Sequence, residues 1–101
     1  MSVVAPMTRP SEVLRTRRDV VLSAVRAHGV LNPRIIGSEA RGTDTPQSDV
    51  DLVVTVPRGS ALSFLSLGDY LTDLLGVHVD VVSDGGLSET SRTVLDEAVP
   101  L

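Results

Sequence analysis

The sequence contains no cysteine, no lysine and no tryptophan, and it has one phenylalanine and one tyrosine among 101 residues. Without cysteine, neither a disulfide framework nor a thiolate metal site can form. A surface that binds nucleic acid needs a basic field and aromatic rings on which bases stack. Because the formal net charge is −4 and aromatic residues are scarce, we expect no direct contact with nucleic acid.

Long apolar segments are also missing. No apolar run approaches the roughly 18 residues that a membrane helix needs, so we expect no contact with a membrane. The N-terminus lacks the basic segment followed by an apolar core that marks a signal peptide. These features predict a cytoplasmic protein.

The length of 101 residues fits one domain. Residues 1–10 contain two prolines and little pattern, which is typical of a loose N-terminal arm. We assign the domain itself to residues 11–101. A chain of this size has no room for a separate domain that recognises a substrate.

Helix-like and strand-like patterns alternate along the chain and predict a single α/β (α+β) domain, with a small mixed β-sheet and helices packed on it. Ser11 and Ser60 are the predicted N-caps of two helices. Gly68 falls inside a predicted helix, which indicates close packing or a kink there. The predicted helices span 11–28, 61–76 and 88–97, the predicted strands span 34–36, 50–56 and 77–83, and a short helical turn spans 38–42.

Two aspartates stand at the start of the strand 50–56. Side chains alternate across a strand, so Asp49 and Asp51 point to the same face, opposite the apolar side chains that should face the helices. Two carboxylates at this spacing repel each other unless a cation lies between them. Oxygen ligands of this kind favour Mg²⁺ or Mn²⁺, and Mg²⁺ usually completes its shell with water and substrate phosphates. The pair therefore suggests a nucleotide site.

The Gly37-Ser38 step ends one predicted strand and opens the helical turn. Free backbone N–H groups at such a step bind phosphate, and glycine allows close approach. Ser38 is expected to cap the turn and to donate a hydrogen bond to a phosphate oxygen.

Asp80 lies within the predicted strand 77–83, on the opposite face from its valine neighbours. A carboxylate in such a run is costly unless it is paired or binds a metal. If this strand lies beside 50–56, then Asp49, Asp51 and Asp80 converge on one face. That arrangement suits two metal ions that catalyse phosphoryl or nucleotidyl transfer.

The joint pattern, Gly37-Ser38 followed by Asp49-Val50-Asp51 and later Asp80, resembles the signature of the minimal nucleotidyltransferases of the DNA polymerase β superfamily. The stretch GSEARGTDTPQSDVDL resembles the antitoxin branch of that group, whose members pair with HEPN-domain ribonuclease toxins. The resemblance implies that Asp49, Asp51 and Asp80 bind two Mg²⁺ or Mn²⁺ ions, with Asp80 also activating the acceptor hydroxyl. It implies that Gly37 and Ser38 hold the triphosphate of ATP, and that AMP is transferred to a tyrosine of the toxin within a hetero-oligomer.

The chain departs from this pattern at Glu39, because family members often carry a basic residue directly after the Gly-Ser step. An acidic side chain beside a triphosphate is unfavourable unless it turns outward or pairs with an arginine. Arg41 or Arg58 is expected to contact the phosphates instead.

Two alternatives to AMP transfer onto a toxin remain. In one, the domain is a binding module that neutralises its partner by steric occlusion, which the departure at Glu39 favours and the three retained aspartates disfavour. In the other, the acceptor is a small molecule or tRNA, and the short chain offers little surface to recognise either. Structural roles are expected for Ser48 in a turn, for Tyr70 on a helix rim, and for His78 at a strand edge or in the core.

Overall fold

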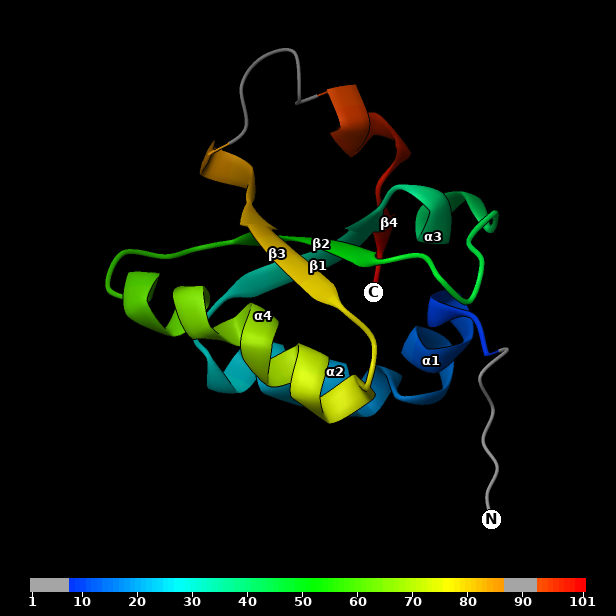
Figure 1. The fold of residues 1–101 in the computed structure, drawn as a ribbon. Helices are drawn as coiled ribbons and strands as arrows, with labels where there is room; N and C mark the ends of the chain where they lie inside the picture. The colour runs from blue at the N-terminus through cyan, green and yellow to red at the C-terminus, as the bar shows by residue number, and fades with distance from the viewer. Residues whose placement is uncertain (1–7, 87–92) are drawn as a thin grey trace.

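The computed structural model describes residues 8–86 and 93–101. Its centre is a four-stranded mixed sheet with the strand order β3-β2-β1-β4 (Figure 1). Strand β2 is parallel to β3 and antiparallel to β1, which in turn is antiparallel to β4. The strands span Leu31–Ile36 (β1), Val50–Thr55 (β2), Val79–Ser83 (β3) and Val99–Pro100 (β4).

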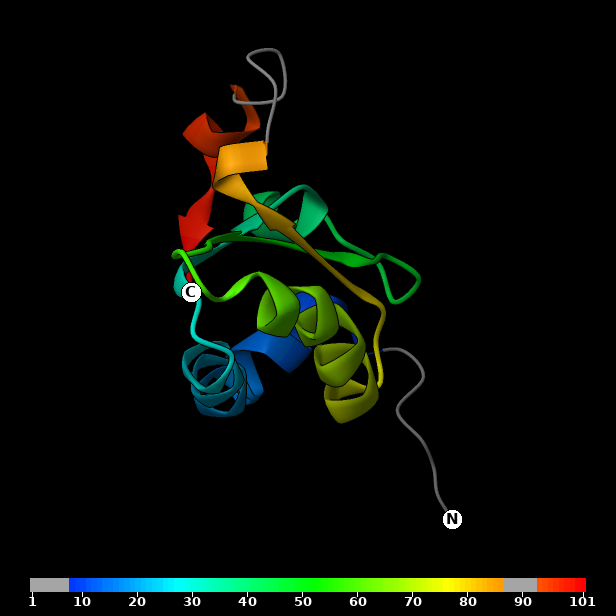
Figure 2. The same ribbon diagram turned by 90° about the vertical axis from the view of Figure 1, so that its left-hand side faces the viewer.

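Helices cover one face of this sheet and form the core with it. Helices α2 and α4 lie side by side beneath the strands, as the view in Figure 2 shows. Alternate residues of β2 are buried against them, while Asp51 on the same strand points to the other face. The predicted α/β (α+β) class with a small mixed sheet is thereby confirmed. The helical elements are α1 (Pro10–Thr16), α2 (Arg18–Ala27), α3 (Ser38–Arg41), α4 (Ala61–Leu75), and the 3₁₀ turns η1 (Asp84–Gly86) and η2 (Thr93–Glu97).

The close packing predicted at Gly68 is confirmed. A Cβ atom added at this residue would lie 3.2 Å from the carbonyl oxygen of Val79, so α4 passes directly against β3. One turn later, the hydroxyl of Thr72 accepts a hydrogen bond of 3.0 Å from the backbone N–H of Val79. The helix therefore occupies part of the outer edge of β3.

The prediction of one helix over 11–28 is wrong, because the chain forms α1 and α2 with a break at Arg17. The hydroxyl of Thr16 donates to the carbonyl oxygen of Glu12 at 3.0 Å, a back-bond of a kind that bends helices. Ser11 is not the N-cap either, since α1 begins with Pro10 at its first position, where the missing N–H costs nothing. The N–H of Ser11 instead donates to Asp44 at 2.8 Å.

The C-terminal part also differs from the prediction. Of the helix predicted over 88–97, residues 88–92 lie outside the described part of the chain, and the remainder forms the 3₁₀ turn η2. The residues after this helix form β4, which pairs with β1, and the backbone N–H of Leu101 donates a 3.0 Å hydrogen bond to the carbonyl oxygen of Pro33. Pro100 is tolerated because β4 is an edge strand. Strand β1 is longer than the predicted 34–36, because its first residue, Leu31, pairs with Thr55 of β2.

Candidate active site

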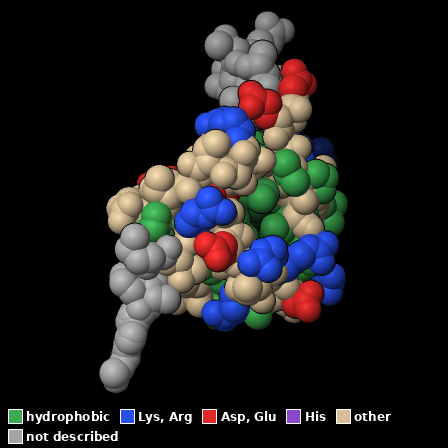
Figure 3. Space-filling view, turned by 90° about the vertical axis from the view of Figure 1, so that its right-hand side faces the viewer, with side chains coloured by type: hydrophobic (Ala, Val, Ile, Leu, Met, Phe, Trp, Pro, Cys, Tyr) green, Lys and Arg blue, Asp and Glu red, His purple; other side chains and the backbone are tan. Residues whose placement is uncertain are grey.

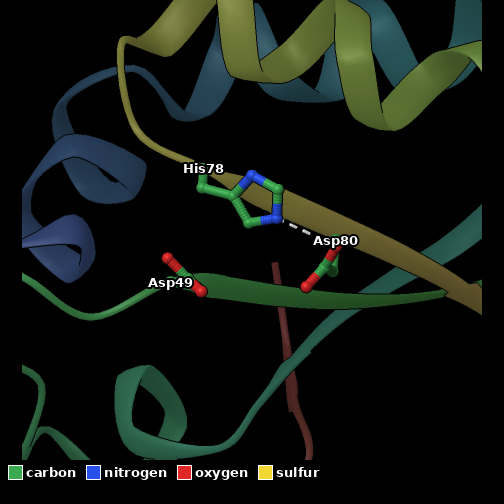
Figure 4. A group of neighbouring side chains, drawn as sticks. All are labelled: Asp49, His78 and Asp80. Carbon is green, nitrogen blue, oxygen red and sulfur yellow. Dashed lines mark hydrogen bonds and ion pairs between the residues drawn. The ribbon is translucent and has the colours of Figure 1, made fainter.

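The parallel pairing of β2 with β3 creates the site. Asp51 lies directly opposite Asp80 in the register, and Val50 lies opposite Val79. In-register residues on parallel strands share a face. The residues one position further back, Asp49 and His78, therefore follow the same alternation, and Figure 4 shows the side chains of Asp49, His78 and Asp80 turned toward one another.

Asp49, His78 and Asp80 form a compact, exposed cluster. Each offers one ligand atom, and these atoms all lie within 4.8 Å of one another. The Nε2 atom of His78 lies 3.1 Å from Oδ1 of Asp80. The cluster thus presents two carboxylates and one imidazole to an incoming ion.

Asp51 faces the other side of the site, toward the turn that precedes α3. Its Oδ2 atom lies 3.3 Å from the position that a Cβ atom would take at Gly37. Burial raises the pKa of Asp51, and the neighbouring charges of Asp80 and Asp49 raise it further. The mutual repulsion expected from the sequence is therefore present around this carboxylate.

At Gly37 the backbone of the turn lies close to the carboxylate of Asp51. Gly37 has φ 78° and ψ −151°, a conformation that side chains strongly disfavour. Gly37 is also the N-cap residue of α3, and Gly42 ends this helix in the left-handed conformation. The short helical turn is confirmed, but the capping role of Ser38 is wrong, since its hydroxyl donates to Glu39 at 3.3 Å.

Glu39 points inward, which the sequence did not reveal. Its side chain is buried, with 5% of its surface exposed, and its Oε1 atom has no hydrogen-bond partner among the described residues. Burial raises the pKa of Glu39, and the charges of Asp44 and Asp51 act in the same direction. Arg41 does not pair with it, because the guanidinium of Arg41 lies 3.8 Å from Glu97 on the surface.

The donor set fits a divalent cation. Asp49, Asp51 and Asp80 supply oxygen atoms, which Mg²⁺ and Mn²⁺ prefer. Burial first, and then the charges of Asp80 and Asp49, raises the pKa of Asp51, and a cation nearby would favour its charged form. The residue that sequence reasoning missed is His78, which was assigned a structural role. His78 and Asp80 are two residues apart, as Asp49 and Asp51 are, and this repeated spacing in the sequence could have indicated that His78 shares a face with Asp80.

A groove of about 210 Å³ runs from this cluster along the outer side of β3. His78 and Asp80 line one end, and Phe64 and Leu65 of α4 line the other. A larger hollow of about 400 Å³ lies between α2 and α4 beside Tyr70, on the helical side of the molecule. The first groove, not the larger one, reaches one of the site carboxylates, Asp80.

Carboxylates on neighbouring parallel strands, with a glycine turn folded against one of them, define a nucleotidyltransferase. The chain belongs to the nucleotidyltransferase domain family, whose model matches residues 18–99. The enzyme class expected from the sequence is therefore confirmed.

Two curated relatives are similar over most of their length. Protein adenylyltransferase MntA of Thermococcus cleftensis is 41% identical over 73 residues, which are 70% of this chain and 74% of the relative. A protein of Methanocaldococcus jannaschii, named as a candidate protein adenylyltransferase, is 34% identical over 77 residues, which are 75% of this chain and 76% of the relative.

Solved structures agree with the fold. One, described as a candidate minimal nucleotidyltransferase, has a TM-score of 0.79 at 45% identity and covers 90% of this chain and 95% of that chain. A toxin–antitoxin complex with AMP-PNP has a TM-score of 0.67 at 20% identity, over 81% of this chain and 69% of that chain. At that identity the second match supports the fold alone.

Proposed function

We propose that this protein is an antitoxin that transfers AMP from ATP to a tyrosine hydroxyl of a HEPN ribonuclease toxin. The observation that carries the proposal is the register of β2 and β3, which sets Asp51 opposite Asp80 beside the Gly37 turn. The names of the relatives, which are protein adenylyltransferases, support AMP as the group and protein as the acceptor. The description of a fold neighbour as a toxin–antitoxin complex is the reason for testing a toxin as the partner.

Each site residue has a distinct role in this proposal. Asp49, Asp51 and Asp80 hold two Mg²⁺ or Mn²⁺ ions, which when bound supply charge stabilisation at the phosphates and lower the pKa of the acceptor hydroxyl. Gly37 and Ser38 hold the triphosphate. Arg41 leaves its contact with Glu97 and contacts the triphosphate instead. Asp80 accepts the proton of the tyrosine hydroxyl. The hydroxyl oxygen bonds to the α-phosphorus, the bond from that phosphorus to the β-phosphate oxygen breaks, and pyrophosphate leaves.

A protein acceptor suits so short an enzyme. The groove beside β3 reaches Asp80 from the surface, and Leu65 at its far end is 71% exposed. A partner protein can present its own hydroxyl along this path and supply the recognition surface itself. A small molecule or tRNA would need contacts that the described residues do not gather around the groove.

A second candidate is neutralisation by steric occlusion without catalysis. It is favoured by the buried Glu39, whose charge would oppose a triphosphate bound at the Gly37 turn. Asp49, Asp51 and Asp80 would then be idle. ATP turnover in the presence of the partner separates the two candidates.

The test uses the product of the adjacent reading frame, expected to be a small helical protein with an Arg-x4-His motif and a nearby tyrosine. The purified partner is incubated with ATP, Mg²⁺ and the wild-type protein, and mass spectrometry measures added AMP. Asp80→Asn should keep most of the ATP affinity in a separate titration and lose transfer by about 10²–10⁴-fold, the usual share of a general base. Transfer at the wild-type rate would remove Asp80 from the mechanism, and a tight complex with no added mass would favour occlusion.

A further inference from the structure

His78 occupies a position that no part of the proposed mechanism uses. It comes directly before β3, as Asp49 comes directly before β2, so the two residues stand side by side at the entrance of the parallel pair. Figure 4 shows its ring directed toward Asp80 and Asp49 rather than away from them. Its side chain is 56% exposed, so core packing does not explain this orientation.

The other histidine of the chain, His28, has contacts typical of a structural role. His28 has its Nδ1 atom 2.7 Å from the carbonyl oxygen of Ala24, and its ring packs on Tyr70 with 5.1 Å between the centroids. The ring of His78 instead forms a hydrogen bond with Asp80, a carboxylate of the candidate metal site. The two histidines therefore form a natural pair for comparison.

The geometry around His78 matches a metal shell. Ligands of a six-coordinate ion with bonds of about 2.1 Å are about 3.0 Å apart when they occupy adjacent positions. Nε2 of His78 and Oδ1 of Asp80 are 3.1 Å apart, and an oxygen of Asp49 completes the triplet within 4.8 Å. All three side chains are exposed, which leaves them free to adjust their rotamers around one ion.

We propose that His78 is a ligand of the metal ion held by Asp49 and Asp80, and that it makes this position prefer first-row transition ions over Mg²⁺. Imidazole is a common ligand of transition metals, whereas Mg²⁺ is bound mainly by oxygen. Oxygen ligands alone also bind Co²⁺ more tightly than Mn²⁺. One nitrogen in the set strengthens the preference for these two ions over Mg²⁺, with Co²⁺ the stronger of the two.

The experiment uses chelator-treated full-length protein without nucleotide or partner. Co²⁺ binding is followed by its visible absorption, Mn²⁺ binding by the electron paramagnetic resonance signal of the free ion, and Mg²⁺ affinity by competition with Mn²⁺. The variants are His78→Gln, the matched control His28→Gln, and Asp80→Asn. Circular dichroism and a thermal melt establish that each variant is folded.

We expect His78→Gln to weaken Co²⁺ and Mn²⁺ binding by about 10-fold or more, the scale on which loss of a contact at a metal site acts, while Mg²⁺ affinity changes by less than about twofold. His28→Gln should bind all three ions as the wild type does. Equal Co²⁺ affinity in wild type and His78→Gln would overturn the proposal, as would equal losses in the two histidine variants, since these would indicate non-specific binding to imidazole.

The inference rests on the metal site of the proposed function, and the Asp80→Asn variant separates the two. If Asp80→Asn loses metal and His78→Gln does not, the carboxylate site stands and His78 is not a ligand. If the wild-type protein binds none of the three ions, both the role of His78 and the metal site of the free protein are overturned.

Discussion

At the scale of single residues, Glu39 is the side chain of the site whose burial is energetically most unfavourable. Its carboxyl group is buried beside Asp51, one of its oxygens is unpaired, and no arginine reaches it within the described residues. A buried, partly satisfied carboxylate costs free energy when it is ionised. The pKa of Glu39 is raised because burial disfavours its charged form.

Replacement of Glu39 by glutamine keeps its size and removes its charge. Because the folded-state pKa of Glu39 lies above its value in the unfolded chain, the associated stability is present below the unfolded pKa and is lost as pH rises through the folded pKa. At neutral pH, Glu39→Gln should therefore raise the free energy of unfolding, by about 1 kcal/mol. It should also tighten ATP binding.

Urea denaturation at several pH values and calorimetry with Mg²⁺ and ATP measure these effects. Glu12→Gln is the control, since the side chain of Glu12 on α1 is 46% exposed and pairs loosely with Arg9 at 3.6 Å. A destabilised Glu39→Gln at neutral pH would mean that the carboxylate form makes favourable contacts that outweigh its burial.

Gly37 and Gly42 bracket α3 and allow a matched test of the turn. Both have positive φ, but only at Gly37 would a Cβ atom meet a neighbour, Oδ2 of Asp51 at 3.3 Å. We expect Gly42→Ala to cost about 1 kcal/mol of stability, from backbone strain alone. Gly37→Ala should cost about 2 kcal/mol, because it adds displacement of Asp51 to the backbone strain. ATP affinity, measured by calorimetry, should fall only in Gly37→Ala. An equal loss of affinity in both variants would mean that the turn acts only through its overall stability.

At the scale of elements, one carboxylate joins three of them. Asp84 in η1 accepts a 2.6 Å hydrogen bond from the hydroxyl of Thr55 in β2 and a 2.9 Å hydrogen bond from Arg34 in β1. The Thr55 hydrogen bond lowers the pKa of Asp84, and Arg34 lowers it further. The chain leaving β3 is thus fixed to the middle of the sheet.

Stability should depend on this carboxylate in acid. Because the folded-state pKa of Asp84 lies below its unfolded value, its contribution is present above the unfolded pKa and is lost as pH falls through the folded pKa. Asp84→Asn should cost about 1 kcal/mol at neutral pH and make the acid limb of the stability curve shallower. Urea denaturation from neutral to acid pH measures this, with Asp73→Asn on the exposed side of α4 as control. An unchanged acid limb in Asp84→Asn would assign the acid sensitivity to other carboxylates.

The helices and strands differ in how well they could be predicted from the sequence. Strand β2 and helix α4 were predicted nearly to the residue, because their apolar patterns are long and their ends carry turn residues. The break between α1 and α2 depends on a hydroxyl of Thr16 bonding to its own helix, which apolar periodicity does not record. Strand β4 has two residues and exists only because β1 is there to pair with it.

The site was predictable to a similar degree. The carboxylates of Asp49 and Asp51 share a face by alternation alone, but the approach of Asp80 required β3 to lie beside β2. The inward orientation of Glu39 depends on how α3 packs. The proximity of His78 to Asp49 and Asp80 was missed because it depends on the register between two strands that are distant in sequence.

At the scale of the whole molecule, charge is mixed rather than uniform. The face in Figure 3 carries arginine side chains interspersed with acidic ones among the residues drawn in colour. No helix in the described part of the chain is long and apolar enough to cross a membrane.

Ligand binding at this site should raise the stability of the entire fold. A ligand that binds only the folded state stabilises it by about 2.7 kcal/mol at 100 times its dissociation constant. Thermal melts with Mg²⁺ and ATP should show this gain for the wild type, and the double variant Asp49→Asn, Asp51→Asn should lose it. The control is Asp19→Asn, Asp73→Asn, which removes the same charge from exposed positions on α2 and α4. A full Mg²⁺-dependent shift in the Asp49, Asp51 variant would contradict the metal site.

The hydrogen bond from Val79 to Thr72 has a consequence for how the molecule meets others. Strand β3 is an edge of the sheet, and exposed edges attract further strands, which leads to fibrous association between copies. Here the edge donor of Val79 is already used by a helix side chain, and α4 passes too closely at Gly68 for another backbone to enter. A polypeptide that reaches Asp80 from this side cannot extend the sheet at Val79, so it must be recognised there by its side chains.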